Sequence, residues 1–511
     1  MNRIILSLFL AFTTFFSEAQ VSLNDIALEY GKYQVGFNHY LLYDTTRTYQ
    51  RIFDWNNKTT PRPIPVSIWY PSDEIIKNTP QTTILNYMEI LKEEEEWEYL
   101  PNEQILNWFY YANTIENTKH LKEKSEAYLS AKPESGKFPS IIYAPSYQAS
   151  SIENFALCEY LASHGYIIIS SPSRGFENRF LEGGTEKDMD TQARDIESLI
   201  KEISRYPYAD KNKIATIGFS FGGLSNVLAQ MRNRNIKAIV SLDGSIKYQY
   251  ATLQKSPYFS AEKVDVPFIH MAQKDIPKEV LIEDDIDSTL NYSFTFYDDL
   301  KYSRAYSLKF HNLTHSYFST LGLLFQERDQ RQDKSDSEIM ESYKIISIYT
   351  LKFLNAFLKM DLESLSFLEI KPEENNIPPG LISIESKFPD ETPFSFEDFN
   401  ELADGQNYDN LALLYDSIHA IHKNFILEEG KLNNLGLQLV YNPKTSGHGI
   451  KIFILALEIY SESANLYDSL AEAYLYIGNN ELAVKNFKKS LDLNPQNTNA
   501  IDRLEELKIT E

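Results

Sequence analysis

The sequence predicts an α/β protein, with a doubly wound, mostly parallel sheet in its larger N-terminal part and an all-α domain at its C-terminal end. Short apolar runs alternate with helical segments from residue 138 to about 358, the pattern of parallel strands with helices on both faces. From about residue 396 the helical periodicity continues without strands. The 511 residues exceed one typical domain and suit two or three.

The composition argues against several classes of function. Hydrophobic residues make up 43% and aromatic residues 13% of the chain, enough for a large buried core and against global disorder. The formal net charge of −23 would repel phosphate backbones, so nucleic acid is not expected as a partner. Cys158 is the single cysteine, which excludes an intramolecular disulfide and fits a bacterial envelope protein.

The first segment, residues 1–19, resembles a secretory signal peptide. Arg3 supplies a short positive region, and the apolar core over 4–16 is too short to span a bilayer comfortably. The small-x-small pattern ending at Ala19 predicts cleavage before Gln20. No later stretch approaches transmembrane length, so we expect an exported mature chain without a membrane span, either periplasmic or extracellular.

The expected α/β domain covers residues 20–380. Two early strands, "YQVGFNHYLLYD" and "RPIPVSIWYPS", precede a predicted helical insertion over 83–133 that carries the aromatic run Trp108 to Tyr111. This insertion is either a lid over a substrate pocket or an acidic surface helix pair. The following strands are "FPSIIYAP", "YIIISSPSRG", "KIATIGFS", "KAIVSLDG", "VPFIHMAQKD" and "YSLKFHNLTH", each separated from the next by a helical or loop segment.

The C-terminal domain is predicted over residues 381–511, after a proline-containing stretch, 360–395, that lacks clear periodicity. Residues 464–497 match a tetratricopeptide-like repeat of 34 residues. A second, weaker copy precedes it, and a degenerate helix pair precedes that. Such repeats often bind a protein in a concave groove, or they pack on the catalytic domain or on a second copy of the chain. The matching positions are Tyr467, Leu470, Ala471, Tyr474, Gly478, Ala483, Phe487 and Pro495.

The stretch "KIATIGFSFGG" has the form of a nucleophile elbow. A predicted strand ends at Ser220, a helix follows, and Gly218 and Gly222 stand where side chains would collide in the sharp turn. The helix N-terminus adds positive potential where an anion develops. We therefore predict Ser220 as a nucleophile rather than a polar residue in an ordinary glycine turn.

A serine nucleophile needs a histidine base and an acid, which follow it along the chain in this type of fold. His315 lies in "HNLTHSYF", in a loop before a helix, and is favoured over His311, which ends a strand, and His270, which lies inside an apolar run. Asp243 and Asp275 end successive strands, and either could hold the imidazole. Position alone slightly favours Asp275.

The segment from 138 to 318 contains the pieces "LASHGY", "GFSFGG", "SLDG" and "THSYF", and "RPIPVSIWYPS" precedes it. In these pieces the chain resembles the platelet-activating-factor acetylhydrolase branch of the α/β-hydrolases, with kinship to dienelactone hydrolases. The resemblance implies that the acid is Asp243. It also implies backbone N–H groups of Phe221 and Tyr147 as the oxyanion hole, although Pro145-Ser146 stands where the family usually has His-Gly.

These residues predict a serine hydrolase that cleaves a carboxylic ester, such as a short-acyl lipid ester, through an acyl-enzyme. No metal-ligand cluster, phosphate loop or dinucleotide fingerprint is found in the sequence, so no metal or organic cofactor is expected. Two alternatives stay open. One is an exported serine peptidase of the same fold, and the other is a non-catalytic scaffold that binds protein through its repeats.

Overall fold

The computed structural model describes residues 21–56, 58–73, 79–283, 286–325, 332–391 and 393–509. The export signal expected at residues 1–19 lies outside these ranges. The chain divides into two compact units, one ending at Asp390 and one beginning at Glu391. In the described part of the chain, no helix is both long and apolar enough to cross a membrane.

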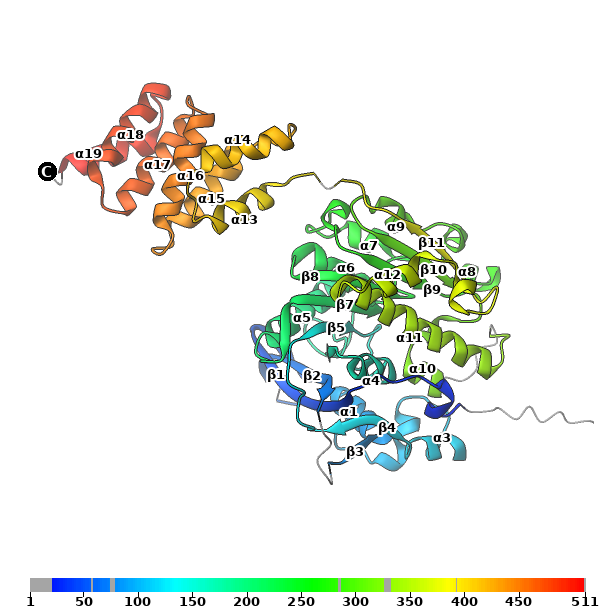
Figure 1. The fold of residues 1–511 in the computed structure, drawn as a ribbon. Helices are drawn as coiled ribbons and strands as arrows, with labels where there is room; N and C mark the ends of the chain where they lie inside the picture. Colours follow the sequence, from blue (N-terminus) through cyan, green and yellow to red (C-terminus); the bar gives the residue numbers. More distant parts are fainter. Residues whose placement is uncertain are drawn as a thin grey trace, which may run out of the picture. The chain divides into compact units, whose positions relative to one another are not determined.

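The first unit is built on one sheet, which contains eleven strands from the described residues, in the order β11-β10-β9-β8-β7-β5-β6-β2-β1-β4-β3 (Figure 1). Strands β6, β5, β7, β8, β9 and β10 run parallel, and β2 pairs with β6 in the antiparallel sense. This is the predicted mostly parallel, doubly wound sheet. The strands are β1 (Gln34–Gln50), β2 (Thr59–Ser72), β3 (Gln81–Thr83), β4 (Lys124–Leu129), β5 (Phe138–Ala144), β6 (Ile167–Ser170), β7 (Ala209–Phe219), β8 (Ile236–Leu242), β9 (Phe268–Ala272), β10 (Ala305–Phe310) and β11 (Ile382–Lys387).

Helices cover both faces of the sheet and give it two hydrophobic cores (Figure 1). On β5, Ile141 and Tyr143 enter one core while Ile142 enters the other, because successive side chains of a strand point to opposite faces. Helices α4 (Phe155–Ser163) and α11 (Asp336–Leu358) complete the first core, and α5 (Glu186–Ile203) and α6 (Gly222–Arg232) complete the second. The shorter helices are α7 (Tyr250–Gln254), α8 (Lys278–Glu283), α9 (Thr295–Asp299), α10 (Thr320–Phe325) and α12 (Leu362–Glu369).

The insertion over 83–133 is not wholly helical, which corrects the prediction. It contains α1 (Ile84–Glu94), α2 (Ile105–Trp108) and α3 (Ile115–His120), but it ends in strand β4, which pairs with β1 and with β3. In "KSEAYL" the side chains of Ser125 and Ala127 are buried while those of Lys124 and Glu126 are exposed. This alternation with a period of two is the strand signal that the helical interpretation overlooked.

The boundary between the units lies later than the predicted residue 380. Strand β11, at 382–387, pairs antiparallel with β10, from Ala305 opposite Lys387 to Phe310 opposite Ile382. Backbone hydrogen bonds to β10 therefore join β11 to the sheet, where it is the last strand at one edge. The first unit accordingly continues to Asp390. The stretch 360–395 therefore contains the last helix and last strand of the α/β unit as well as the connection to the second unit.

The second unit is all-α in its described residues, and from α15 onward each helix packs against the next, while α14 packs against α13 and α16. Leu470, Ala471, Ala483 and Phe487 are buried between helices, and Gly478 turns the chain at φ +80°. These are signature positions of the predicted repeat, whose family assignment stays a prediction. The helices are α13 (Phe396–Gly405), α14 (Leu411–Ile421), α15 (Glu429–Val440), α16 (Ser446–Ile459), α17 (Ala464–Tyr476), α18 (Asn480–Leu493) and α19 (Thr498–Ile509).

Candidate active site

Ser220 lies in the sharp turn between β7 and α6. Its φ is +51°, in the left-handed region that a residue with a side chain seldom adopts. A Cβ added to Gly218 would lie 2.3 Å from the carbonyl oxygen of Gly222, and one added to Gly222 would lie 2.0 Å from the carbonyl oxygen of Ala144. Glycine is therefore required at both positions, and the turn has the form of a nucleophile elbow.

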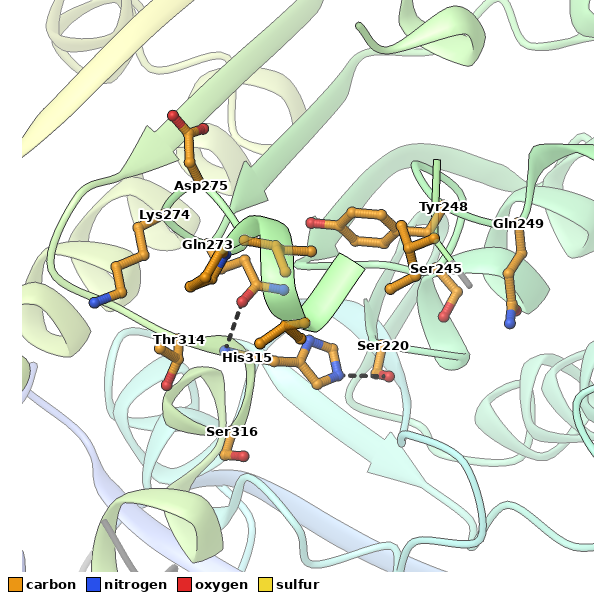
Figure 2. A pocket seen from close by; sticks show the side chains of 14 residues that line it. Ser220, Ser245, Tyr248, Gln249, Gln273, Lys274, Asp275, Thr314, His315 and Ser316 are labelled. Carbon is orange, nitrogen blue, oxygen red and sulfur yellow. Dashed lines mark hydrogen bonds between the residues drawn. The ribbon is translucent and has the colours of Figure 1, made fainter. Parts of the chain in front are cut away.

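His315 lies beside this serine, in the loop that follows β10. Its Nε2 is 2.9 Å from the Ser220 Oγ, and Figure 2 shows the imidazole directed at the hydroxyl. The backbone N–H of His315 donates to the side-chain oxygen of Gln273 at 3.1 Å. The ring also packs on Phe219, with centroids 5.1 Å apart. The side chain is 43% exposed, so it is accessible to a reacting group.

Asp243 holds the other side of the imidazole. Its Oδ2 is 2.5 Å from His315 Nδ1, while its Oδ1 accepts from the Gln273 N–H at 3.0 Å and from the Tyr248 hydroxyl at 3.2 Å. The side chain is fully buried. Burial alone would raise the pKa of Asp243, but the hydrogen bond and charge of His315 and the Gln273 N–H hold this pKa below its ordinary value. The carboxylate is therefore ionised at neutral pH.

Asp275, the alternative acid, faces elsewhere. Its carboxylate is 2.6 Å from the Lys309 ammonium and is 52% exposed. Figure 2 shows it pointing away from His315. The structure thus brings Ser220, His315 and Asp243 together and leaves Asp275 in a surface ion pair.

The two other candidate histidines also lie outside this cluster. His311 Nε2 is 3.2 Å from the Ser383 hydroxyl at the outer edge of the sheet. His270 is fully buried in β9, with Nδ1 2.9 Å from the Ser241 hydroxyl. Burial lowers the pKa of His270 to about 3, so it stays neutral in the core.

The two residues predicted to form the oxyanion hole pack against each other. The rings of Tyr147 and Phe221 lie edge to face, with centroids 6.0 Å apart. Among the described residues, neither backbone N–H has a hydrogen-bond partner. The Tyr147 hydroxyl donates to the carbonyl of Leu181 at 3.2 Å and accepts from the Gly183 N–H at 3.1 Å. Both N–H groups are thus available beside the elbow.

Comparison with known proteins finds sequence similarity to hydrolases over part of this chain. Residues 111–267 match the sequence profile of the X-Pro dipeptidyl-peptidase (S15) family. The fold is that of the α/β-hydrolases, and the comparisons support a serine hydrolase. Dipeptidyl-peptidase 5 of Porphyromonas gingivalis is 27% identical over 143 residues, 26% of this chain; the match covers 21% of that relative, about a fifth of its length. A ferulic acid esterase from Streptomyces cinnamoneus matches with a TM-score of 0.47 and 16% identity, over 70% of this chain and 98% of that chain.

Two pockets of the hydrolase meet at His315. The first, the serine pocket, has a volume of about 320 Å³ and is lined by Ser220, Tyr248, Gln273 and the apolar Ile276 and Val280, among others (Figure 2). The second, the aromatic pocket, has a volume of about 380 Å³. It is lined by His315, by residues 146–150 after β5, and by the insertion residues Trp97, Trp108, Phe109, Tyr110 and Tyr111.

Sequence reasoning did not identify Gln273, which joins the acid and the base of this cluster. Its N–H donates to Asp243, and its side chain accepts from the backbone of His315. It ends the apolar run "VPFIHMAQ" immediately before Lys274. A single polar residue after a buried strand carries no signal of its own, because its role depends on which loops the fold brings beside it.

Proposed function

We propose that this chain is an exported serine esterase that uses Ser220, His315 and Asp243 as a catalytic triad. The observation that carries the proposal is the position of the His315 ring between the Ser220 hydroxyl and the buried Asp243 carboxylate. His315 takes the serine proton as Oγ attacks the ester carbonyl, and the N–H groups of Phe221 and Tyr147 receive the oxyanion. His315 then protonates the leaving alcohol, and water cleaves the acyl-enzyme.

The position of the acid favours an ester substrate. Asp243 immediately follows β8, the strand after the elbow helix, which is the position implied by the acetylhydrolase resemblance. An enzyme that removes dipeptides must also bind a free ammonium group, for which a carboxylate with no other partner is suited. Of the described residues, three carboxylates line the two pockets, and each has a partner: Glu95 pairs with Arg179, Asp275 with Lys309 and Glu153 with Ser146.

A peptidase is the second candidate, supported by the S15 profile match and by the dipeptidyl-peptidase relative. A panel of chromogenic substrates separates the two activities. We expect p-nitrophenyl acetate and butyrate to be hydrolysed, with kcat/KM at least about 100-fold above that for Xaa-Pro-p-nitroanilides, because each described carboxylate that lines the two pockets already has a partner. The reverse order of kcat/KM would establish the peptidase instead.

We propose that the insertion over 83–133 forms a substrate-binding wall along the aromatic pocket, rather than an acidic surface helix pair. Trp97 and Phe109 stack with centroids 5.6 Å apart, and the Arg179 guanidinium lies 4.8 Å from the Trp97 ring. Tyr110 is 93% exposed and has a φ of +59°, an unusual conformation for a bulky side chain. We propose that these rings bind the apolar part of the ester, such as the acyl chain of a small lipid.

Trp108→Ala tests this wall. We expect KM for p-nitrophenyl hexanoate to rise about 10-fold, because part of the apolar contact is lost, while KM for the acetate changes by less than about 2-fold. Steady-state kinetics on both esters gives the comparison. Trp55, which is 88% exposed and lines neither pocket, provides the matched control Trp55→Ala. Equal changes for both esters would contradict the assignment.

We also propose that the signal-like N-terminus exports the protein to the periplasm or the exterior of a bacterial cell. The second unit would then bind a protein partner or a second copy of the chain through its predicted repeats. Mass spectrometry of the mature N-terminus tests the first point, since cleavage before Gln20 is expected.

A further inference from the structure

A buried carboxylate lies behind the residues that follow β5 and has no part in the triad. Glu153 is 7% exposed. Its Oε2 accepts from the backbone N–H of Ser146 at 2.9 Å, and its Oε1 accepts from the Ser146 hydroxyl. Ser146 immediately precedes Tyr147, the residue proposed to donate one oxyanion N–H. We call residues 145–148 the oxyanion loop.

The same part of the chain also holds the segment after His315. The carbonyl of Glu153 accepts from the N–H of Leu321 at 3.2 Å. The neighbouring Asn154 donates to the carbonyl of Phe318 at 3.0 Å and accepts from the N–H of Thr320 at 3.1 Å. Two consecutive residues therefore connect the oxyanion loop to the loop that carries the base.

The buried surroundings of Glu153 disfavour the charged form of its carboxyl group, although they supply hydrogen bonds to it. Burial raises the pKa of Glu153 to about 7, against hydrogen bonds from Ser146 and the charge of His315, which lower it. The titratable groups that face it are Tyr143 of β5, Tyr111 of the insertion and His315. Near neutral pH the Glu153 carboxyl group is therefore protonated in a large fraction of the molecules. A glutamine side chain closely mimics this protonated form.

We propose that Glu153 is a positioning residue, which fixes the Tyr147 N–H toward the developing oxyanion by holding Ser146 with two hydrogen bonds. This inference rests on the proposed function, because it concerns the oxyanion of that reaction. Donors in an oxyanion hole act only when they are held at the place where the charge develops. Tyr147 itself makes hydrogen bonds through its hydroxyl, at the far end of the side chain. Apart from the local bond between the Ala149 N–H and the Ser146 carbonyl, the bonds of Ser146 to Glu153 are those nearest to the Tyr147 N–H.

Three variants of Glu153 separate position from charge. Glu153→Gln can accept from the Ser146 N–H and donate to its hydroxyl, so we expect kcat within about 3-fold of the wild type. Glu153→Ala removes both bonds, and Glu153→Asp keeps the carboxyl group but withdraws it by one methylene. We expect both to lower kcat by about 10- to 100-fold with KM changed by less than about 3-fold, since loss of a whole oxyanion donor costs about 100- to 1000-fold.

An alkyl trifluoromethyl ketone supplies a second readout, because its adduct with Ser220 carries the oxyanion. Its inhibition constant should rise in parallel with the loss of kcat in Glu153→Ala and Glu153→Asp, while thermal unfolding shows which variants are folded. If Glu153→Ala does not fold, the comparison of kcat with the inhibition constant rests on Glu153→Asp. An unchanged inhibition constant in both Glu153→Ala and Glu153→Asp would overturn the role of Glu153 and leave the proposed function standing. A loss of kcat in Glu153→Gln equal to that in Glu153→Ala would do the same. A wild type that neither turns over esters nor forms the adduct would overturn the proposed function, and this inference with it.

Discussion

Ser220→Ala is expected to lower kcat/KM for p-nitrophenyl esters by at least about 10⁴-fold and to leave the fold intact. The substitution removes the only atom that can attack the carbonyl in the proposed mechanism, while His315 keeps its hydrogen bond to Asp243. Alanine has the same Cβ as serine, so the backbone strain of the elbow at φ +51° is not made worse. Initial rates on purified enzyme, with thermal unfolding in parallel, measure both quantities.

A fluorophosphonate probe makes this result specific to one residue. The wild type should be labelled and Ser220→Ala should not, because the probe reacts with an activated serine. Ser204→Ala is the matched control, since Ser204 follows α5 and lines neither pocket. Undiminished labelling or turnover in Ser220→Ala would contradict both the esterase and the peptidase proposals. Absence of labelling in the folded wild type would favour the non-catalytic scaffold.

The elbow was predictable because its sequence signal is local. Gly218 and Gly222 lie two residues from Ser220, and the collision avoided at Gly218 involves Gly222 itself. The collision avoided at Gly222 involves Ala144 at the end of β5, which only the fold brings close. The strand before the turn and the helix after it are continuous in sequence. The central parallel strands were predictable for the same reason, since each is a short apolar run buried on both faces.

The choice of acid was not local, and residue patterns alone left it open. Asp243 and Asp275 both follow buried parallel strands, so both are carried to the same edge of the sheet. What separates them is tertiary: Lys309, on the next strand, pairs with Asp275, while Gln273 links Asp243 to the backbone of His315. The resemblance to a known branch pointed to Asp243, but the supporting contacts became visible only with the fold.

Short strands near the two ends of the sheet and the buried Glu153 escaped sequence reasoning for a related reason. Strands β4 and β11 have six residues each, and neither is a continuous apolar run like the central strands. The short alternation in β4 was therefore overlooked among the helical segments around it. In the sequence, Glu153 is one more acidic residue at the start of a helical pattern. Its burial against Ser146 arises only when the segment between β5 and α4 folds back on itself.

Asp243→Asn is expected to lower kcat by about 10³- to 10⁴-fold, and Asp275→Asn by less than about 3-fold. An asparagine at 243 has nearly the same shape but cannot balance the charge that His315 gains when it accepts the serine proton. Its amide also presents N–H donors that can bind His315 Nδ1, which would place the ring proton on Nε2, where Ser220 needs an acceptor. The loss should therefore appear in kcat rather than in KM. Steady-state kinetics at neutral pH on both variants makes the comparison.

Asp275→Asn is the matched control, because it makes the same chemical change at the end of the adjacent strand. Its ion pair with Lys309 is half exposed, and pairs of this kind contribute about 0–1 kcal/mol. Loss of activity in Asp275→Asn with normal turnover in Asp243→Asn would reverse the assignment, and the geometry around His315 would then not be that of the working enzyme. Equal and small effects would instead mean that the serine–histidine pair works without a fixed acid. The contacts argue against both outcomes, since the Asp243 carboxylate is fully buried, accepts hydrogen bonds on both oxygens and has a lowered pKa.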